Sequence, residues 1–231
     1  MAMRRMCSLL VALALSLTPA VWARQLADYP GWAGEIALRA AGCQSISARI
    51  SGWVLLTEGT APATAAAAAE QLMASLGFSG QATETEEYVF ISGLRAGAVA
   101  TVQALLRDAR WFVVAEVTSQ SDGAGWYNRL GRALSALGPA GAIRVSTIGL
   151  RPGRLDAGAT ALLTRTLCAG LLARDITTVT DGAAGLVTSG TSALLPGVAT
   201  DPTRGGSFAI SLNYSESERA TIITVGVPGL H

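Results

Sequence analysis

The chain has 231 residues, of which half are hydrophobic, and a formal net charge of +1. All 17 of its basic residues are arginines, and they are scattered along the chain. Phosphate backbones and anionic membrane surfaces are bound by clustered basic side chains, so a near-neutral chain without such a cluster predicts no nucleic-acid partner.

The first 23 residues have the pattern of a secretory signal peptide. Arg4 and Arg5 form a basic start, an apolar run follows over residues 9–17, and Val21-Trp22-Ala23 fits the small-x-small cleavage motif. The apolar run is shorter than the roughly 20 residues of a spanning helix, and an uncleaved anchor is the alternative. We expect a secreted or extracytoplasmic protein, cleaved after Ala23, that keeps no stable membrane span. The mature chain, residues 24–231, is predicted to be a single domain.

Two helices are predicted early in the mature chain, with a strand over residues 50–57 between them. The first covers residues 29–41 and is ended by Gly42; its apolar face is expected to hold Tyr29, Trp32, Ile36 and Ala40. The second has Thr60 as a plausible cap and ends before Gly77. Its expected buried face consists of Ala65, Ala68, Ala69, Leu72, Met73 and Leu76.

Four strands and a helix are predicted next. The strands cover residues 80–85, 88–94, 98–106 and 111–118, and residues 107–110 form a hairpin turn. The third strand also fits a helix, and that alternative stays open. The closing helix covers residues 126–137, with Asp122 at its start and Leu130, Leu134 and Leu137 facing inward.

The remaining residues repeat this order. We predict a strand over residues 143–150, a turn over residues 151–153, and a helix from Asp156 to about residue 173. Strands over residues 176–180 and 186–194 follow. A Pro/Gly/Thr-rich loop over residues 195–206 then leads to a hairpin of residues 207–214 and 220–227.

The two halves, about residues 48–138 and 141–228, are therefore interpreted as two copies of one duplicated unit. Ala68, Leu72 and Leu76 correspond to Ala159, Leu163 and Leu167, each 91 residues further along. A repeat of this length is too large for a solenoid. We expect an α+β fold in which a duplicated β-α-β4(-α) unit, preceded by the helix of residues 29–41, forms a pseudo-two-fold antiparallel curved sheet.

The alternation in residues 207–214 indicates which sheet face the helices cover. Phe208, Ile210 and Leu212 alternate with small polar residues, as in a strand with helices on one side and solvent on the other. The same reasoning applied to other strands places five residues on the uncovered face. These speculative binding residues are Arg144, Glu116, Ser146, Ser211 and Asn213. The alternative is that they are only the solvated side of the sheet.

This order of elements resembles the fold of the TATA-box-binding protein. Among exported proteins, the same arrangement is found in the YwmB family, which this chain resembles. The best match is the closing segment Ala220-Thr221-Ile222-Ile223-Thr224-Val225-Gly226-Val227-Pro228, which is similar to that family's last strand with its Gly-x-Pro. Residues 111–118 and 175–192 also fit. The family usually has Thr at the position of Val227 and continues beyond residue 231. The resemblance implies the fold and an exported protein, but no catalytic residue.

Few residues offer catalytic chemistry. The one histidine is His231, which leaves no Ser-His-Asp or Cys-His arrangement, and we expect no metal and no cofactor. Glu84, Glu86 and Glu87 form an acidic cluster that could bind a cation or act as paired carboxylates, or could simply be solvated. Three tryptophans are candidates for a stacking platform or for core packing: Trp53, Trp111 and Trp126. Cys43 and Cys168 either form a disulfide or are buried as small apolar residues.

The leading hypothesis is a non-catalytic binding or scaffold domain at the outer cell surface. Its partner would be an envelope protein, peptidoglycan or a small ligand. The rival hypothesis is a glycan or envelope hydrolase that uses carboxylates alone, with Glu116 paired with one of the acids of residues 84–87. Such an enzyme needs two carboxyl groups about 5–10 Å apart.

Overall fold

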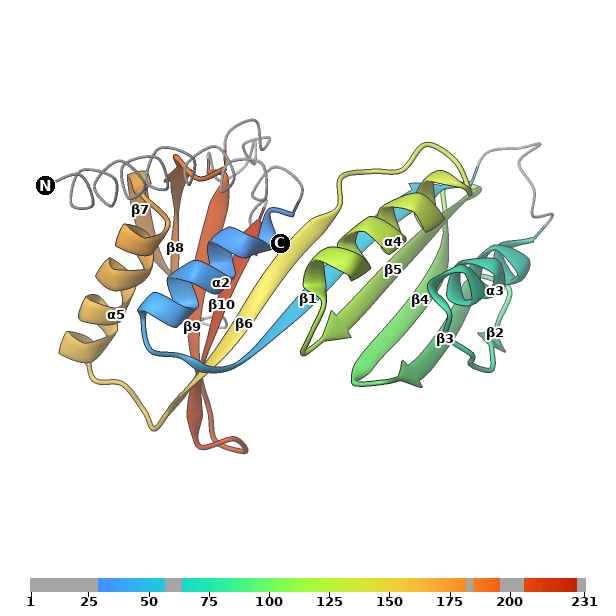
Figure 1. Cartoon of the computed structure of the whole chain (residues 1–231). Coiled ribbons are helices and arrows are strands. Elements are labelled where there is room, and N and C mark those ends of the chain that lie inside the picture. The colour runs from blue at the N-terminus through green and yellow to red at the C-terminus, as the bar shows by residue number, and fades with distance from the viewer. Residues whose placement is uncertain (1–28, 57–63, 182–184, 196–205, 228–231) are drawn as a thin grey trace, which may run out of the picture.

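A ten-stranded antiparallel sheet with four helices makes up the described part of the chain, in an α+β arrangement (Figure 1). The computed structural model describes residues 29–56, 64–181, 185–195 and 206–227. The predicted signal peptide lies outside these residues. In chain order the elements are α2 (Gly31–Ala40), β1 (Gln44–Leu55), α3 (Ala65–Leu76), β2 (Thr83–Glu84), β3 (Tyr88–Arg95), β4 (Ala98–Arg107), β5 (Arg110–Ser119), α4 (Gly123–Ser135), β6 (Arg144–Pro152), α5 (Ala157–Gly170), β7 (Ala173–Asp181), β8 (Gly185–Ser192), β9 (Phe208–Ser215) and β10 (Ala220–Val227).

The sheet is ordered β2-β3-β4-β5-β1-β6-β10-β9-β8-β7, so β1 and β6 pair at its centre. From β1 the chain passes through α3 to the edge strand β2 and meanders back to β5. From β6 it passes through α5 to the other edge, β7, and meanders back to β10. Because β1 and β6 are hydrogen-bonded, the two halves share one continuous, curved sheet.

All four helices lie on one face of the sheet (Figure 1). In the first half, α4 packs on β1 and β5, and α3 packs on β3 and β4. In the second half, α2 packs on β6 and β10 and also contacts α5. The apolar core lies between this helical layer and the sheet, in two clusters that follow the two halves. None of the described helices is long and apolar enough to cross a membrane.

Three helices begin at side-chain caps. Thr64, Asp122 and Asp156 each accept a hydrogen bond from the backbone N–H three residues ahead, which satisfies a donor that the first helical turn leaves free. Asp156 confirms its predicted role as a cap. Asp122 was expected as an entry residue, but α4 begins directly after it at Gly123, three residues before the predicted start at residue 126. The predicted cap Thr60 lies outside the described residues, and the cap of α3 is Thr64. Gly77 ends α3 in the left-handed conformation, with φ of +79°. The buried face of α3 is the one predicted.

The predicted buried face of α2 is only partly correct: Tyr29, just before the helix, is buried, but Trp32 and Ile36 are half-buried and Ala40 is exposed. We expected its large apolar residues to face inward, but the helix buries Ala33, Gly34, Ala37 and Leu38. The physical reason is the close approach of α2 to its neighbours. A Cβ atom on Gly34 would lie 2.7 Å from the hydroxyl of Thr147 on β6, so no larger residue fits at this position without a shift.

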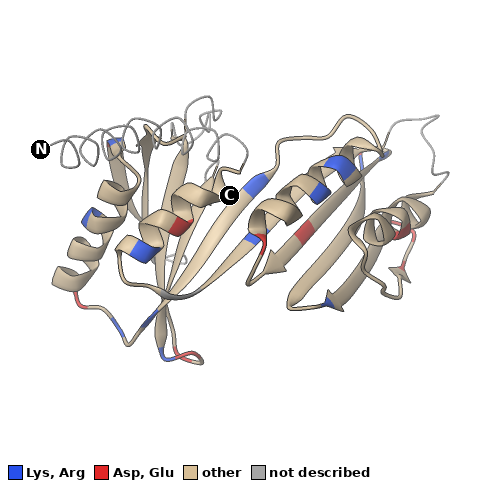
Figure 2. Cartoon of the chain, viewed as in Figure 1, with Lys and Arg blue, Asp and Glu red and all other residues tan. Residues whose placement is uncertain are grey.

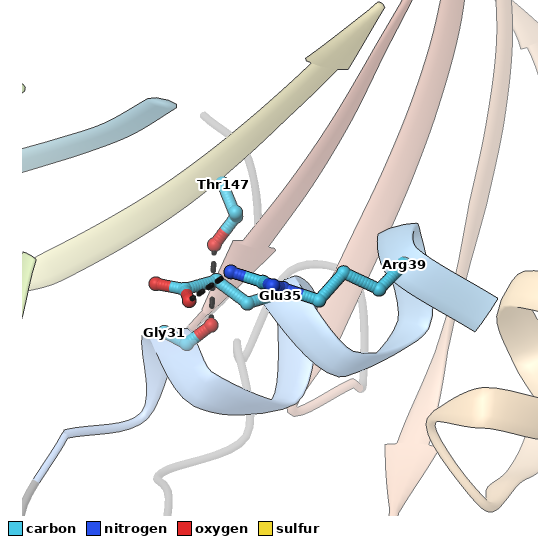
Figure 3. Close-up of polar contacts among 4 residues, drawn as sticks. All are labelled: Gly31, Glu35, Arg39 and Thr147. Carbon is cyan, nitrogen blue, oxygen red and sulfur yellow. Dashed lines mark hydrogen bonds and ion pairs between the residues drawn. The ribbon is translucent and has the colours of Figure 1, made fainter. Parts of the chain in front are cut away.

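One polar contact connects α2 to the sheet, and an ion pair lies within the helix (Figure 3). The Thr147 hydroxyl donates to the Gly31 carbonyl oxygen at 3.3 Å, in a buried position. One turn along, Arg39 Nη2 lies 4.0 Å from Glu35 Oε2. Burial raises the pKa of the Glu35 carboxyl above its ordinary value, and the charge of Arg39 partly opposes this shift.

Several strand boundaries differ from the predictions. β1 begins at Gln44, because Gln44 and residues 47–49 still pair with β6. Only residues 83–84 of the predicted strand 80–85 pair with β3. β6 extends through Pro152, where a turn was expected, because residues 151–152 still pair with β10. α5 stops at Gly170 because Leu172 has φ of +48°, and β7 begins directly after it, at Ala173.

Two other predictions are confirmed. Residues 98–107 form the strand β4 rather than a helix, and the turn to β5 lies at residues 107–110. Asp108 and Ala109 have φ of +50° and +58°, the conformation of a tight two-residue hairpin turn. The hairpin of β9 and β10 also forms as expected.

Candidate functional site

The sheet face opposite the helices, here called the open face, carries a polar patch at its centre. Across the adjacent strands β5, β1 and β6, Glu116 lies opposite Ser51, and Ser51 lies opposite Arg144. In the next row Thr118, Arg49 and Ser146 align in the same way. Arg49 Nε lies 3.4 Å from Glu116 Oε1, and both side chains are partly exposed. We call these six residues the central polar patch.

The predicted binding residues share one face but are spread over several strands. The open face includes all five, but only Arg144, Glu116 and Ser146 belong to the central polar patch. Asn213 lies on β9, four strands from Glu116 on β5, which corresponds to roughly 19 Å at about 4.8 Å per strand.

Ser211 is also not exposed as expected, since its relative exposure is 8%. It lies directly between Val187 of β8 and Thr224 of β10. These branched neighbours shield its short side chain. The prediction that β9 is solvated on one side is therefore wrong at this position.

Beside the central polar patch, two rows of the open face in the first half are largely apolar and are interrupted by Gln103. Trp53 of β1 and Phe112 of β5 have ring centroids 6.2 Å apart. Tyr88 and Phe90 of β3 stack at 6.4 Å. We call this surface the apolar strip; its residues are Trp53, Leu55, Tyr88, Phe90, Leu105, Phe112 and Val114, of which Trp53 is the most exposed at 40%. Leu94 and Val99, exposed at 77% and 44%, form a separate apolar pair on the same face, beyond the row of Ser92 and Thr101.

The three candidate tryptophans take different roles. Trp53 alone of the three lies on the open face, where it can stack on a ligand. Trp126 is buried, and its ring lies 5.2 Å from that of Phe78. Trp111 is half-buried and packs against the core of the first half. The rest of the apolar strip was missed, although the alternation of Tyr88 and Phe90 with Val89 and Ile91 carried the signal.

The proposed pair of carboxylates does not form. Glu84 pairs with Val89, whose side chain points into the core, so Glu84 belongs to the helical face and Glu116 to the open face. Three strand spacings, roughly 14 Å, separate their backbones. Glu86 and Glu87 are exposed in the turn before β3. Within the described ranges, no three His, Cys, Asp or Glu side chains gather as a metal site would require.

Both cysteines of the described chain are free thiols in the second half of the core. Cys168 is buried and Cys43 half-buried. Burial raises the pKa of each thiol, and for Cys43 the nearby Arg151 partly offsets the shift. The predicted alternative of small buried apolar residues therefore describes them, and the disulfide does not form in this structure.

Tyr29 is a buried polar group with no hydrogen-bond partner for its hydroxyl among the described residues. Its ring packs edge-on against Trp32 and Tyr127, with centroids 6.3 and 5.8 Å away. Burial, with smaller contributions from Glu35 and Asp122, raises the pKa of the phenol above its ordinary range. The group therefore stays protonated, and its packing joins the start of α2 to α4.

Comparisons with known proteins do not assign this surface. No protein-family profile matches the chain, and a search of curated proteins found no similar sequence.

Proposed function

We propose that this chain is an exported, non-catalytic binding domain that docks a protein of the cell envelope on the open face of its sheet. The observation that carries the proposal is the partly exposed apolar strip beside the central polar patch. A contiguous exposed apolar surface rimmed by polar groups is typical of protein–protein contacts. A small ligand, in contrast, is usually enclosed in a concave pocket.

The composition of the open face supports a protein partner. Trp53 and Phe112 present aromatic surface, and aromatic side chains are enriched at the centre of interfaces. Arg49, Glu116 and Arg144 carry charges of both signs at the border of the strip, which suits a partner with a complementary pattern. In this view the Arg49–Glu116 pair fixes orientation, and the apolar strip supplies most of the affinity.

The proposal includes a duplicated fold similar to that of the TATA-box-binding protein. The strand order supports the duplication, because it runs β1-β5-β4-β3-β2 on one side of the centre and β6-β10-β9-β8-β7 on the other. Leu72 and Leu163, related by the shift of 91 residues, are both buried in helices that follow the central strands. Among the described residues no helix follows β10, and α2 packs on β6 and β10 as α4 packs on β1 and β5.

Export and membership of the YwmB family are parts of the same proposal. They are supported by the pattern of the first 23 residues and by the similarity of the closing strand Ala220–Val227. Peptidoglycan is the second candidate partner, because the exposed ring of Trp53 offers a stacking surface for a sugar.

Site-specific photo-cross-linking in the native host tests the proposed function. A photoreactive phenylalanine analogue replaces Leu94 on the open face in one strain. In the control strain it replaces Leu162, which is similarly exposed on the helical side. We expect a discrete protein adduct at Leu94 and none at Leu162. No adduct at Leu94, or the same adduct at both positions, would contradict the proposal.

Co-sedimentation with insoluble peptidoglycan separates the two candidate partners. If a protein is the partner, neither the native chain nor its Trp53→Ala variant sediments. If peptidoglycan is the partner, the native chain sediments and the variant remains in solution, since the exposed ring is lost.

A further inference from the structure

A second surface, on the helical side, carries three arginines around one groove. The groove lies between the end of α3 and the outer side of α4, is open to solvent, and has a volume of about 570 Å³. It is lined by Arg95 from the end of β3 and by Arg129 and Arg132 from α4. Figure 2 shows basic positions in blue on the side of α4 turned away from the sheet.

Each of these arginines is held by a neighbour. Arg95 Nη1 donates to the Gly77 carbonyl oxygen at 2.9 Å. The guanidinium of Arg129 lies over the Trp126 ring, 4.9 Å from its centroid. Arg132 Nε donates to the Asn128 carbonyl oxygen at 3.3 Å. A guanidinium has five N–H donors, so each group keeps donors free while its position is restricted.

The charges in the groove have no acidic neighbour to balance them. No residue lining the groove is acidic, and the ion pairs found in the described ranges, Glu35–Arg39 and Arg49–Glu116, lie elsewhere. The C-terminal end of α3 would repel an anion through its free carbonyl groups. Arg95 covers one of these, that of Gly77, so this end of the groove is made more positive.

We propose that the groove between α3 and α4 binds a small phosphate-bearing ligand. A phosphate group has several acceptor oxygens and about two negative charges, and arginine matches it with paired N–H donors. Arg129 and Arg132, three residues apart on one helix, present their side chains on the same side. Arg95 completes the set from the other wall. This site is independent of the open face, because the two lie on opposite sides of the sheet.

Calorimetric titration of the purified full-length chain with pyrophosphate tests the proposal. We expect saturable binding that weakens with added salt. Arg132→Gln is expected to weaken it at least about tenfold, which corresponds to roughly 1.4 kcal/mol. Arg132→Lys should restore only part of the loss, since an ammonium lacks the planar pair of donors. The matched control is Arg165→Gln on the outer side of α5, which removes the same charge and should leave the affinity unchanged.

Amide chemical shifts locate the ligand without relying on any variant. Pyrophosphate should shift the resonances of Gly77, Ala133 and Ala136 and leave that of Ser51 on the open face unchanged. Co-sedimentation with vesicles of anionic phospholipid shows whether a lipid headgroup supplies the phosphate. If the native chain sediments and Arg132→Gln does not, the ligand is a headgroup. If the chain binds pyrophosphate but does not sediment with the vesicles, the ligand is a soluble compound. The proposal is overturned by the lack of saturable binding, by equal weakening in Arg165→Gln, or by shifts confined to other surfaces.

Discussion

Leu162 and Leu163 are adjacent on α5, yet we expect their truncation to change the free energy of unfolding by very different amounts. Leu163 is 2% exposed and packs in the core of the second half, whereas Leu162 is 63% exposed. Truncating a buried leucine to alanine removes its transfer free energy and leaves a cavity, which together cost about 2–5 kcal/mol. We therefore expect Leu163→Ala to lower the free energy of unfolding by that amount. Leu162→Ala should change it by less than about 0.5 kcal/mol.

Urea unfolding followed by circular dichroism measures both values. A loss of 2–5 kcal/mol is a large share of the roughly 5–15 kcal/mol that stabilise a domain. Leu72→Ala should match Leu163→Ala, because Leu72 is equally buried at the equivalent place in α3. Leu72→Asp and Leu163→Asp should be more severe, since each buries an unpaired carboxylate. Equal unfolding midpoints for Leu162→Ala and Leu163→Ala would refute the placement of α5. A native midpoint in either aspartate variant would refute the 91-residue register.

Three further outcomes are expected. Burial raises the pKa of the Glu35 carboxyl in the folded state, so its ionisation destabilises the fold as the pH rises through that pKa. In urea titrations at neutral pH, Glu35→Gln should therefore have a higher free energy of unfolding than the native chain. At pH values below the ordinary pKa of a glutamate the two should be equally stable. Cys43 and Cys168 should react with a thiol reagent more slowly than free cysteine at neutral pH, because their raised pKa values disfavour the thiolate; equal rates would contradict their burial. Halves separated within residues 138–142 should not fold alone, since each exposes a central strand; a dispersed NMR spectrum from either half would disprove this.

Local patterns predicted most of the helices and strands. The face of α3 followed from helical spacing, and the caps Asp122 and Asp156 followed from residue type and position. The buried face of α2 was not predicted correctly in full, because the sequence analysis chose the helical stripe that carries the large apolar residues. The contact with Thr147, more than a hundred positions further along the chain, requires a glycine or a similarly small residue at position 34. Ala33, Gly34, Ala37 and Leu38 also recur at helical spacing, but tertiary packing decides which of the two apolar stripes is buried.

The candidate surfaces were only partly accessible to sequence reasoning. Strand alternation placed Glu116 and Asn213 on the same face correctly, because the period of a strand is two residues. It carried no information on their separation, which depends on the order of strands in the sheet. The arginine-lined groove was missed for a related reason. Arg95 and Arg132 meet only because β3 and α4 are brought together by the fold.

The affinity of the cross-linked partner for open-face variants tests the central claim most directly. Arg144→Glu reverses a charge in the central polar patch, and Arg165→Glu makes the same change on the helical side. We predict that Arg144→Glu weakens binding at least about tenfold while the melting temperature stays unchanged, and that Arg165→Glu binds as the native chain does. Trp53→Ala should weaken binding as well. Native affinity in both Arg144→Glu and Trp53→Ala would contradict the account and move the contact away from the open face, toward residues 195–206.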